Sequence, residues 1–223
     1  MKRRKITLLN GLILLFLIQS NLAFSGEEDY TFDTSNDFLM NATILGAIAS
    51  FGFSCYQGKA PCSLSPDVDT NKLTFSVDIG ADNSIKHTRL ALGADWLEDI
   101  YNGKNLNISG RMEINTSLWT SSLKHPENKS GFVIGIHPVF RYASPQVFSN
   151  VYLELGAGPQ LLSDTVIENE NKSILFQFAN ILGFGYDGKK FEIGYRYLHI
   201  SNANIKTPNP GTDFHNLHFA YHF

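Results

Sequence analysis

The last ten residues, 214–223, read FHNLHFAYHF, and their side chains alternate between apolar and polar types. In a β-strand, successive side chains point to opposite faces of the sheet. One face of this strand carries Leu217, Phe219, Tyr221 and Phe223, and the other carries Asn216, His218, Ala220 and His222. A small barrel in hydrocarbon requires an apolar outside and a polar inside, because lipid cannot hydrate polar groups. The stretch therefore predicts one strand of a transmembrane β-barrel.

Seven segments upstream share this alternation and are bounded by Gly, Asn, Ser, Pro or charged residues. They are longer than the roughly five to six residues of most soluble strands, and they suit tilted strands that cross a bilayer. Residues 72–223 therefore predict an all-β, eight-stranded antiparallel transmembrane β-barrel. The seven segments are 72–81, 85–97, 105–119, 131–143, 151–163, 174–187 and 191–203.

The N-terminus, residues 1–25, has the features of a signal peptide. The basic MKRRK precedes an apolar run, and Ala23 and Ser25 supply small residues before a cleavage site at Gly26. An uncleaved anchor is the alternative, but the apolar run is short for a spanning helix.

A soluble lipocalin-like barrel would show a similar alternation of apolar and polar side chains along its strands. Export, the strand lengths and the terminal Phe223, which resembles the end of bacterial outer-membrane barrels, favour the bacterial outer membrane.

The charge of the mature chain argues against a nucleic-acid partner. Without the four basic residues of MKRRK, 14 Lys and Arg remain against 21 Asp and Glu, a net charge of -7. That balance lacks the basic footprint of a nucleic-acid-binding protein.

Residues 26–71 form an N-terminal extension whose role the sequence does not define. It contains an apolar run, FLMNATILGAIASFGF at 38–53, followed by Cys55 and Cys62. In an oxidising periplasm these cysteines would close a small disulfide loop, and free thiols are the alternative. A periplasmic helix, a cap and a surface segment all remain open for the extension.

Residues 197–213, YLHISNANIKTPNPGTD, contain candidate catalytic side chains on the predicted lipid-facing side of the seventh strand. His199 and Ser201 share a strand face, with Cα atoms about 6 to 7 Å apart, and lie near the outer-leaflet end of the strand. A histidine can take the proton of a serine hydroxyl, and a carboxylate can hold the histidine in the useful tautomer. Asp213 has the right position on the next strand to be that carboxylate. Asn202, Asn209 and the backbone amides around Asn204 are candidate oxyanion donors.

Each of these residues also has an ordinary structural explanation. A His-x-Ser pair on a strand arises often by chance, and Asp213, Asn202 and Asn209 are common turn residues. Polar groups on a lipid-facing row are nevertheless costly, which favours a function for them.

The stretch RYLHISNANIKTPNPGTDF, with YLELGAGPQLLSDT and FQFANILGFGY upstream, resembles the lipid A 3-O-deacylases, also grouped as acyloxyacyl-hydrolase-like outer-membrane proteins. The resemblance implies a serine esterase that removes the ester-linked 3-hydroxyacyl chain at position 3 of lipid A in lipopolysaccharide. It implies Ser201 as nucleophile, His199 as base and Asp213 as acid, where family members often have Glu. It also implies an acyl groove near Phe178, and Asn204 stands where Gly is common. The resemblance implies no cofactor and no metal.

Two other functions remain open, namely a non-enzymatic adhesin or structural barrel and a lipid A acyltransferase barrel. A metal site built from His215, His218 and His222 is not expected, because the last two point inward and the first outward. The sequence leaves a homodimer open.

Overall fold

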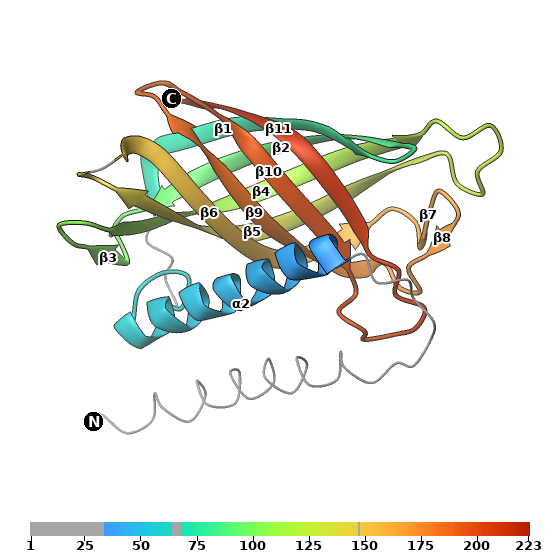
Figure 1. Ribbon diagram of the computed structural model, residues 1–223, viewed down its shortest axis with the longest axis horizontal. Helices are drawn as coiled ribbons and strands as arrows, with labels where there is room; N and C mark the ends of the chain where they lie inside the picture. Colours follow the sequence, from blue (N-terminus) through green and yellow to red (C-terminus); the bar gives the residue numbers. More distant parts are fainter. Residues whose placement is uncertain (1–33, 64–67, 147) are drawn as a thin grey trace.

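The computed structural model describes residues 34–63, 68–146 and 148–223, so the predicted signal peptide, 1–25, lies outside the described residues. Eight long antiparallel strands form a closed barrel, in agreement with the sequence prediction (Figure 1). They are β1 Val68–Asp82, β2 Ile85–Trp96, β4 Asn107–Ser121, β5 Ser130–Ser144, β6 Phe148–Leu162, β9 Phe176–Asp187, β10 Phe191–Ser201 and β11 Thr212–His222.

The barrel closes where the first and last strands meet. β1 pairs with β11 on one side and with β2 on the other, and β2 continues to β4. Three short strands lie outside the sequence prediction, namely β3 Tyr101–Asn102, β7 Val166–Ile167 and β8 Glu170–Asn171. β7 and β8 pair with each other in the connection before β9, which lies at the same end of the barrel as the 202–211 loop (Figure 1).

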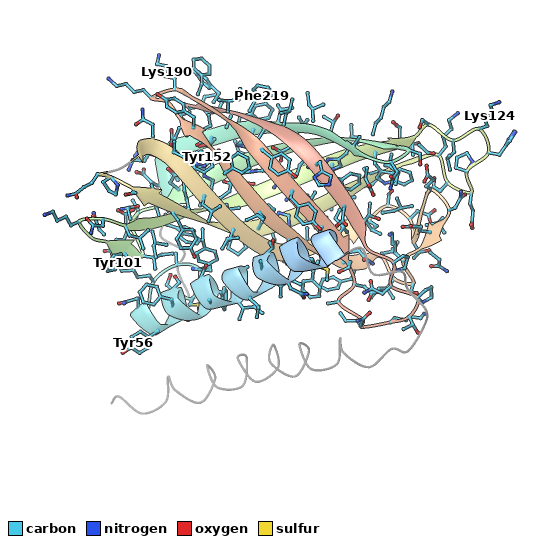
Figure 2. All side chains as sticks on the ribbon, in the orientation of Figure 1. Tyr56, Tyr101, Lys124, Tyr152, Lys190 and Phe219 are labelled. Atoms are coloured by element: carbon cyan, nitrogen blue, oxygen red, sulfur yellow. A yellow bond between two sulfur atoms is a disulfide. The ribbon has the colours of Figure 1, made fainter. Side chains whose placement is uncertain are left out.

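The two faces of the strands differ as the alternation predicts. On β11, His218 and Ala220 are buried, while Leu217, Phe219 and Tyr221 are exposed on the outside. Figure 2 shows Phe219 on the outside of the barrel and Tyr152, a buried residue, among the strands. An outside covered with apolar side chains fits hydrocarbon surroundings.

The interior contains a network of ion pairs. The Arg196 guanidinium bonds to the carboxylates of Glu113, at 2.9 Å, and of Glu154. Arg89 bonds to Asp78 at 2.9 Å and to Glu113 at 2.8 Å. Both arginines therefore have carboxylate partners, which a barrel of this width needs because its lumen is packed with side chains.

Glu192 and Arg196 lie on the same inward face of β10, but they do not pair with each other. Glu192 bonds instead to Arg111 at 2.8 Å and to Arg141 at 2.6 Å. Four residues along one strand span about 13 Å, so the two side chains reach partners across the lumen rather than each other.

The extension contains one helix in its described part, α2, from Thr34 to Gln57. It lies along the outside of the barrel and contacts β6 and β9 (Figure 1). None of the helices in the described ranges is both long enough and apolar enough to span a bilayer.

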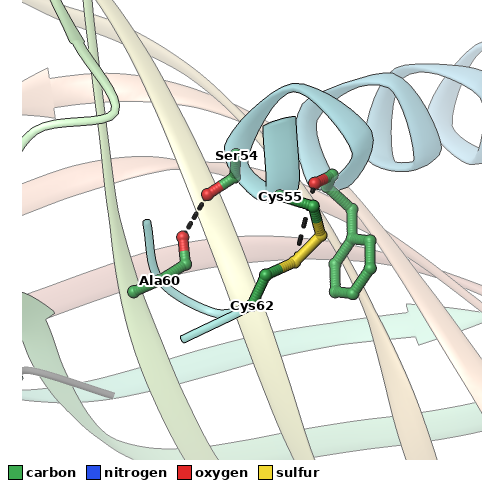
Figure 3. The surroundings of a disulfide bond; sticks show 5 residues. Ser54, Cys55, Ala60 and Cys62 are labelled. Carbon is green, nitrogen blue, oxygen red and sulfur yellow. Dashed lines mark hydrogen bonds between the residues drawn. A yellow bond between two sulfur atoms is a disulfide. The ribbon is translucent and has the colours of Figure 1, made fainter. Parts of the chain in front are cut away.

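A disulfide between Cys55 and Cys62 closes the turn that follows α2 (Figure 3). The Ser54 hydroxyl donates to the carbonyl of Ala60 inside the same turn. Tyr56, near the end of α2, and Tyr101 in β3 lie at one end of the barrel, and Lys124 lies at the other (Figure 2). The turn is thus fixed at the barrel end opposite the 202–211 loop.

Candidate active site

β10 and β11 place the predicted residues on the outside of the barrel. The register between these strands is continuous and sets His199 opposite Asp213, and the register with β9 sets Ser201 opposite Phe178. Arg196 points inward, as its interior partners show. His199 and Ser201 have the opposite parity along the same unbroken strand, so both point outward.

The imidazole of His199 and the carboxylate of Asp213 are directly hydrogen-bonded. His199 Nδ1 lies 2.6 Å from Asp213 Oδ1. The short aspartate side chain reaches the ring because strand pairing brings the two backbones together, and no special approach of the loop is needed. A carboxylate on Nδ1 leaves Nε2 free to accept a proton, which is the tautomer a general base needs.

Tyr197 is a third member of this group that the sequence did not single out. Its hydroxyl donates to the same Asp213 Oδ1 at 2.8 Å, and its side chain is fully buried. Two donors therefore fix the carboxylate from two sides. The signal was present in the sequence, because Tyr197 precedes His199 by two residues and so shares its face.

Ser201 is half-buried at the end of β10. Within the described residues, no hydrogen bond joins its hydroxyl to the His199 ring. The spacing along the strand still keeps the two side chains adjacent, and such bonds often tighten only when substrate binds.

The three asparagines of the 202–211 loop come together, but their side chains hold the loop itself. The Asn202 backbone N–H donates to Asn209 Oδ1 at 2.7 Å, and its side-chain amide donates to the Lys206 carbonyl at 2.7 Å. Asn209 Nδ2 donates to Asn204 Oδ1 at 3.0 Å. Ala203 and Asn204 have positive φ, 53° and 59°, a conformation that asparagine tolerates. The alternative role as turn formers therefore fits their side chains.

Lys172, from the connection between β8 and β9, anchors the end of this loop. Its ammonium donates to the Pro210 carbonyl at 2.7 Å and to Thr212 Oγ1 at 2.6 Å, and it pairs with Glu170 at 2.7 Å. Burial lowers the pKa of Lys172, although its hydrogen bond and ion pair with Glu170 oppose this effect. No local sequence pattern could reveal this role, because the contact joins two loops far apart in the chain.

Gly211 packs against the His199 ring. A Cβ at this position would lie 2.6 Å from His199 Cε1, so any side chain there would displace the imidazole. On β9, Asn180 is buried beside His199 and Phe178 is half-buried beside Ser201. The Phe178 ring meets that of Phe176 edge-on, with centroids 5.1 Å apart. An apolar surface thus adjoins the serine.

Asp187, Glu192 and His222 bring their ligand atoms within 4.8 Å of one another near the opposite end of the barrel. Both carboxylates already bond to Arg141, at 3.1 Å from Asp187 and 2.6 Å from Glu192. The group continues the interior ion-pair network. His215, by contrast, is exposed on the outside, and His218 is buried inside against Asp78.

Comparison with known proteins gives a family match over most of the barrel. The model of the lipid A 3-O-deacylase (PagL) family matches residues 86–222, a range that includes every residue of the predicted site and excludes α2.

Two relatives are both named lipid A deacylase PagL. The one from Bordetella bronchiseptica is 38% identical over 87 residues, which is 39% of this chain and 47% of that protein. The chain therefore aligns with about half the length of this relative. The one from Pseudomonas aeruginosa is 25% identical over 132 residues, covering 59% of this chain and 75% of that protein.

A crystal structure described as the outer membrane enzyme PagL shares the fold. It superposes with a TM-score of 0.58 at 24% sequence identity, covering 66% of this chain and 98% of that one. Because the family model covers more than half of the sequence, this chain belongs to the lipid A 3-O-deacylase (PagL) family.

Proposed function

We propose that the protein is an outer-membrane serine esterase that removes the ester-linked 3-hydroxyacyl chain at position 3 of lipid A. The observation that carries the proposal is the 2.6 Å bond between His199 and Asp213 on the outside of the barrel, beside Ser201. Family membership and the names of both relatives support lipid A as the substrate. The predicted signal peptide, 1–25, would direct export of the chain across the inner membrane.

In this mechanism, Ser201 Oγ attacks the ester carbonyl carbon while His199 Nε2 takes the hydroxyl proton. The tetrahedral oxyanion collapses to an acyl-enzyme as the C–O bond to the sugar breaks. The protonated His199 then gives its proton to the departing sugar oxygen, which becomes the free hydroxyl of lipid A. Water, deprotonated by His199, then attacks the acyl-enzyme carbonyl, and His199 returns this proton to Ser201 Oγ as the bond to the serine breaks and a 3-hydroxy fatty acid leaves.

The remaining side chains position these three. Asp213 stabilises the imidazolium that forms in each step, and Tyr197 and the Lys172-anchored loop hold Asp213 in place. For the oxyanion we propose the backbone amides of Ala203 and Asn204, since the Asn202 backbone N–H and the Asn202 and Asn209 side chains are engaged within the loop. Phe178 would line the path of the acyl chain.

Mass spectrometry of lipid A from a host expressing the protein tests this proposal. We expect loss of one 3-hydroxyacyl chain, and at least a roughly thousandfold lower rate for Ser201→Ala. Ser130→Ala, an exposed serine at the start of β5, is the matched control and should keep full activity. Gain of a chain would point to an acyltransferase, and unchanged lipid A to a non-enzymatic barrel.

A further inference from the structure

α2 buries small and polar residues and exposes several large apolar ones. Phe51 is an apolar exception, since it packs against the buried cluster that contains Trp96, Ile100 and Phe140. A helix between a protein surface and hydrocarbon is expected to show this arrangement, since small residues allow close packing and apolar ones face lipid. The buried set is Thr43, Ala47, Ser50 and Ser54, and the exposed set is Leu45, Phe53 and Tyr56.

Small residues let α2 approach the barrel closely. A Cβ on Gly46 would lie 2.5 Å from Leu155 Cδ1 on β6, whereas a Cβ on Gly52 would meet nothing within 4 Å. The Ser50 and Tyr142 hydroxyls are hydrogen-bonded, which ties the helix to β5. The position of α2 on the barrel is therefore set by specific contacts.

α2 lies next to the candidate active site. It contacts β9, the strand whose Asn180 and Phe178 stand opposite His199 and Ser201. The N-terminal end of α2 lies toward the ends of β9 and β10 from which the 202–211 loop departs (Figure 1). An acyl chain leaving Ser201 toward β9 would therefore run along the side of the barrel on which α2 lies.

Burial on the outer face agrees with this placement. Tyr197, His199 and Asn180 point outward yet are at most 7% exposed. Ile193, on the same face of β10 but further from the site, is 54% exposed, and Phe184 on β9 is 57% exposed. The outside of the barrel is thus covered around the histidine and open away from it.

We propose that α2 is a specificity element that forms a second wall of the acyl path, opposite the outward side chains of β9. Its close approach at Gly46 sets the width of this path and hence which hydroxyacyl chains reach Ser201, while membrane hydrocarbon covers its other face. The inference rests on the proposed esterase function. α2 lies outside residues 86–222, which the family model matches.

The matched pair Gly46→Leu and Gly52→Leu tests the wall. Purified full-length protein is given lipid A bearing either a 3-hydroxydecanoyl or a 3-hydroxytetradecanoyl chain at position 3. We expect Gly46→Leu to shift the ratio of the two rates by on the order of tenfold, and Gly52→Leu to keep the parent ratio. An unchanged ratio in Gly46→Leu, or equal loss on both substrates, would overturn the proposal.

A structural measurement separates failure of the wall from failure of the esterase. Gly46→Cys with Leu155→Cys should react with a short bis-maleimide in outer-membrane vesicles, giving a 46–155 cross-link, whereas Gly52→Cys with Leu155→Cys should not. Absence of the 46–155 cross-link would show that α2 does not dock, whatever the activity. A 46–155 cross-link in the double-cysteine variant, together with a parent protein that removes no chain, would refute the esterase alone.

Discussion

At the scale of single residues, the pairing of His199 with Asp213 explains how an aspartate serves where the family resemblance often has glutamate. The two residues are directly opposite in the β10–β11 register, and the carboxylate already reaches Nδ1 at 2.6 Å. A glutamate would extend past this position and lose the bond that Tyr197 donates to the same oxygen.

We therefore expect Asp213→Glu to lower the rate by about tenfold and Asp213→Asn by on the order of a thousandfold, since the amide favours the wrong tautomer of His199. Rates on lipid A at saturating and limiting substrate would measure both. Equal activity of the Asn variant and the parent would remove Asp213 from the mechanism.

The sequence could predict His199, Ser201 and Asp213 together because strand parity alone puts them on one face. It could not predict that the side chains of Asn202 and Asn209 form hydrogen bonds within the loop, since those bonds depend on how the loop folds back on itself. Strand parity also puts Tyr197 on the face of His199 and Ser201. Its role was not predicted, because a tyrosine on a lipid-facing strand face needs no functional explanation.

At the scale of elements, the connection between β8 and β9 fixes the 202–211 loop through hydrogen bonds. Lys172 and Ser173 bond to carbonyls of Pro210, at 2.7 Å, and Pro208, at 2.6 Å, so the connection before β9 clamps the loop that leads into Asp213. A buried ammonium with several acceptors is destabilising to replace, because the acceptors then lose their partner.

Lys172→Met should lower the deacylation rate by about tenfold or more by loosening the loop, while the barrel itself stays folded. Heat-modifiable migration in gels reports the barrel, and lipid A mass spectrometry reports the rate. Lys124→Met, in the β4–β5 connection, is the control and should behave as the parent. A fully active Lys172→Met variant would contradict the clamp.

The sequence could not predict which face of α2 packs against the barrel. The run at 38–53 is apolar on nearly all sides, so it gives no amphipathic stripe from which a packing face could be read. Its contacts with Leu155, Tyr142 and the cluster around Phe140 reveal which side meets the barrel.

At the scale of the whole molecule, the barrel was predictable because every strand repeats the same alternation. All eight predicted segments match one long strand each, although β1 begins at Val68, four residues before the predicted start at 72. The interior ion pairs, by contrast, join distant strands, so only the closed barrel shows which charges meet. The same closure places the catalytic candidates outside, where a lipid substrate can reach them without entering the lumen.

The central claim is that Ser201, on the outside of the barrel, is a nucleophile activated by His199. Treatment of outer-membrane vesicles with a long-chain alkyl fluorophosphonate, followed by peptide mapping, tests it most directly. The account predicts a phosphonyl adduct on Ser201 that is lost in His199→Ala and retained in His215→Ala. An adduct on another residue, or labelling of Ser201 that does not depend on His199, would contradict it.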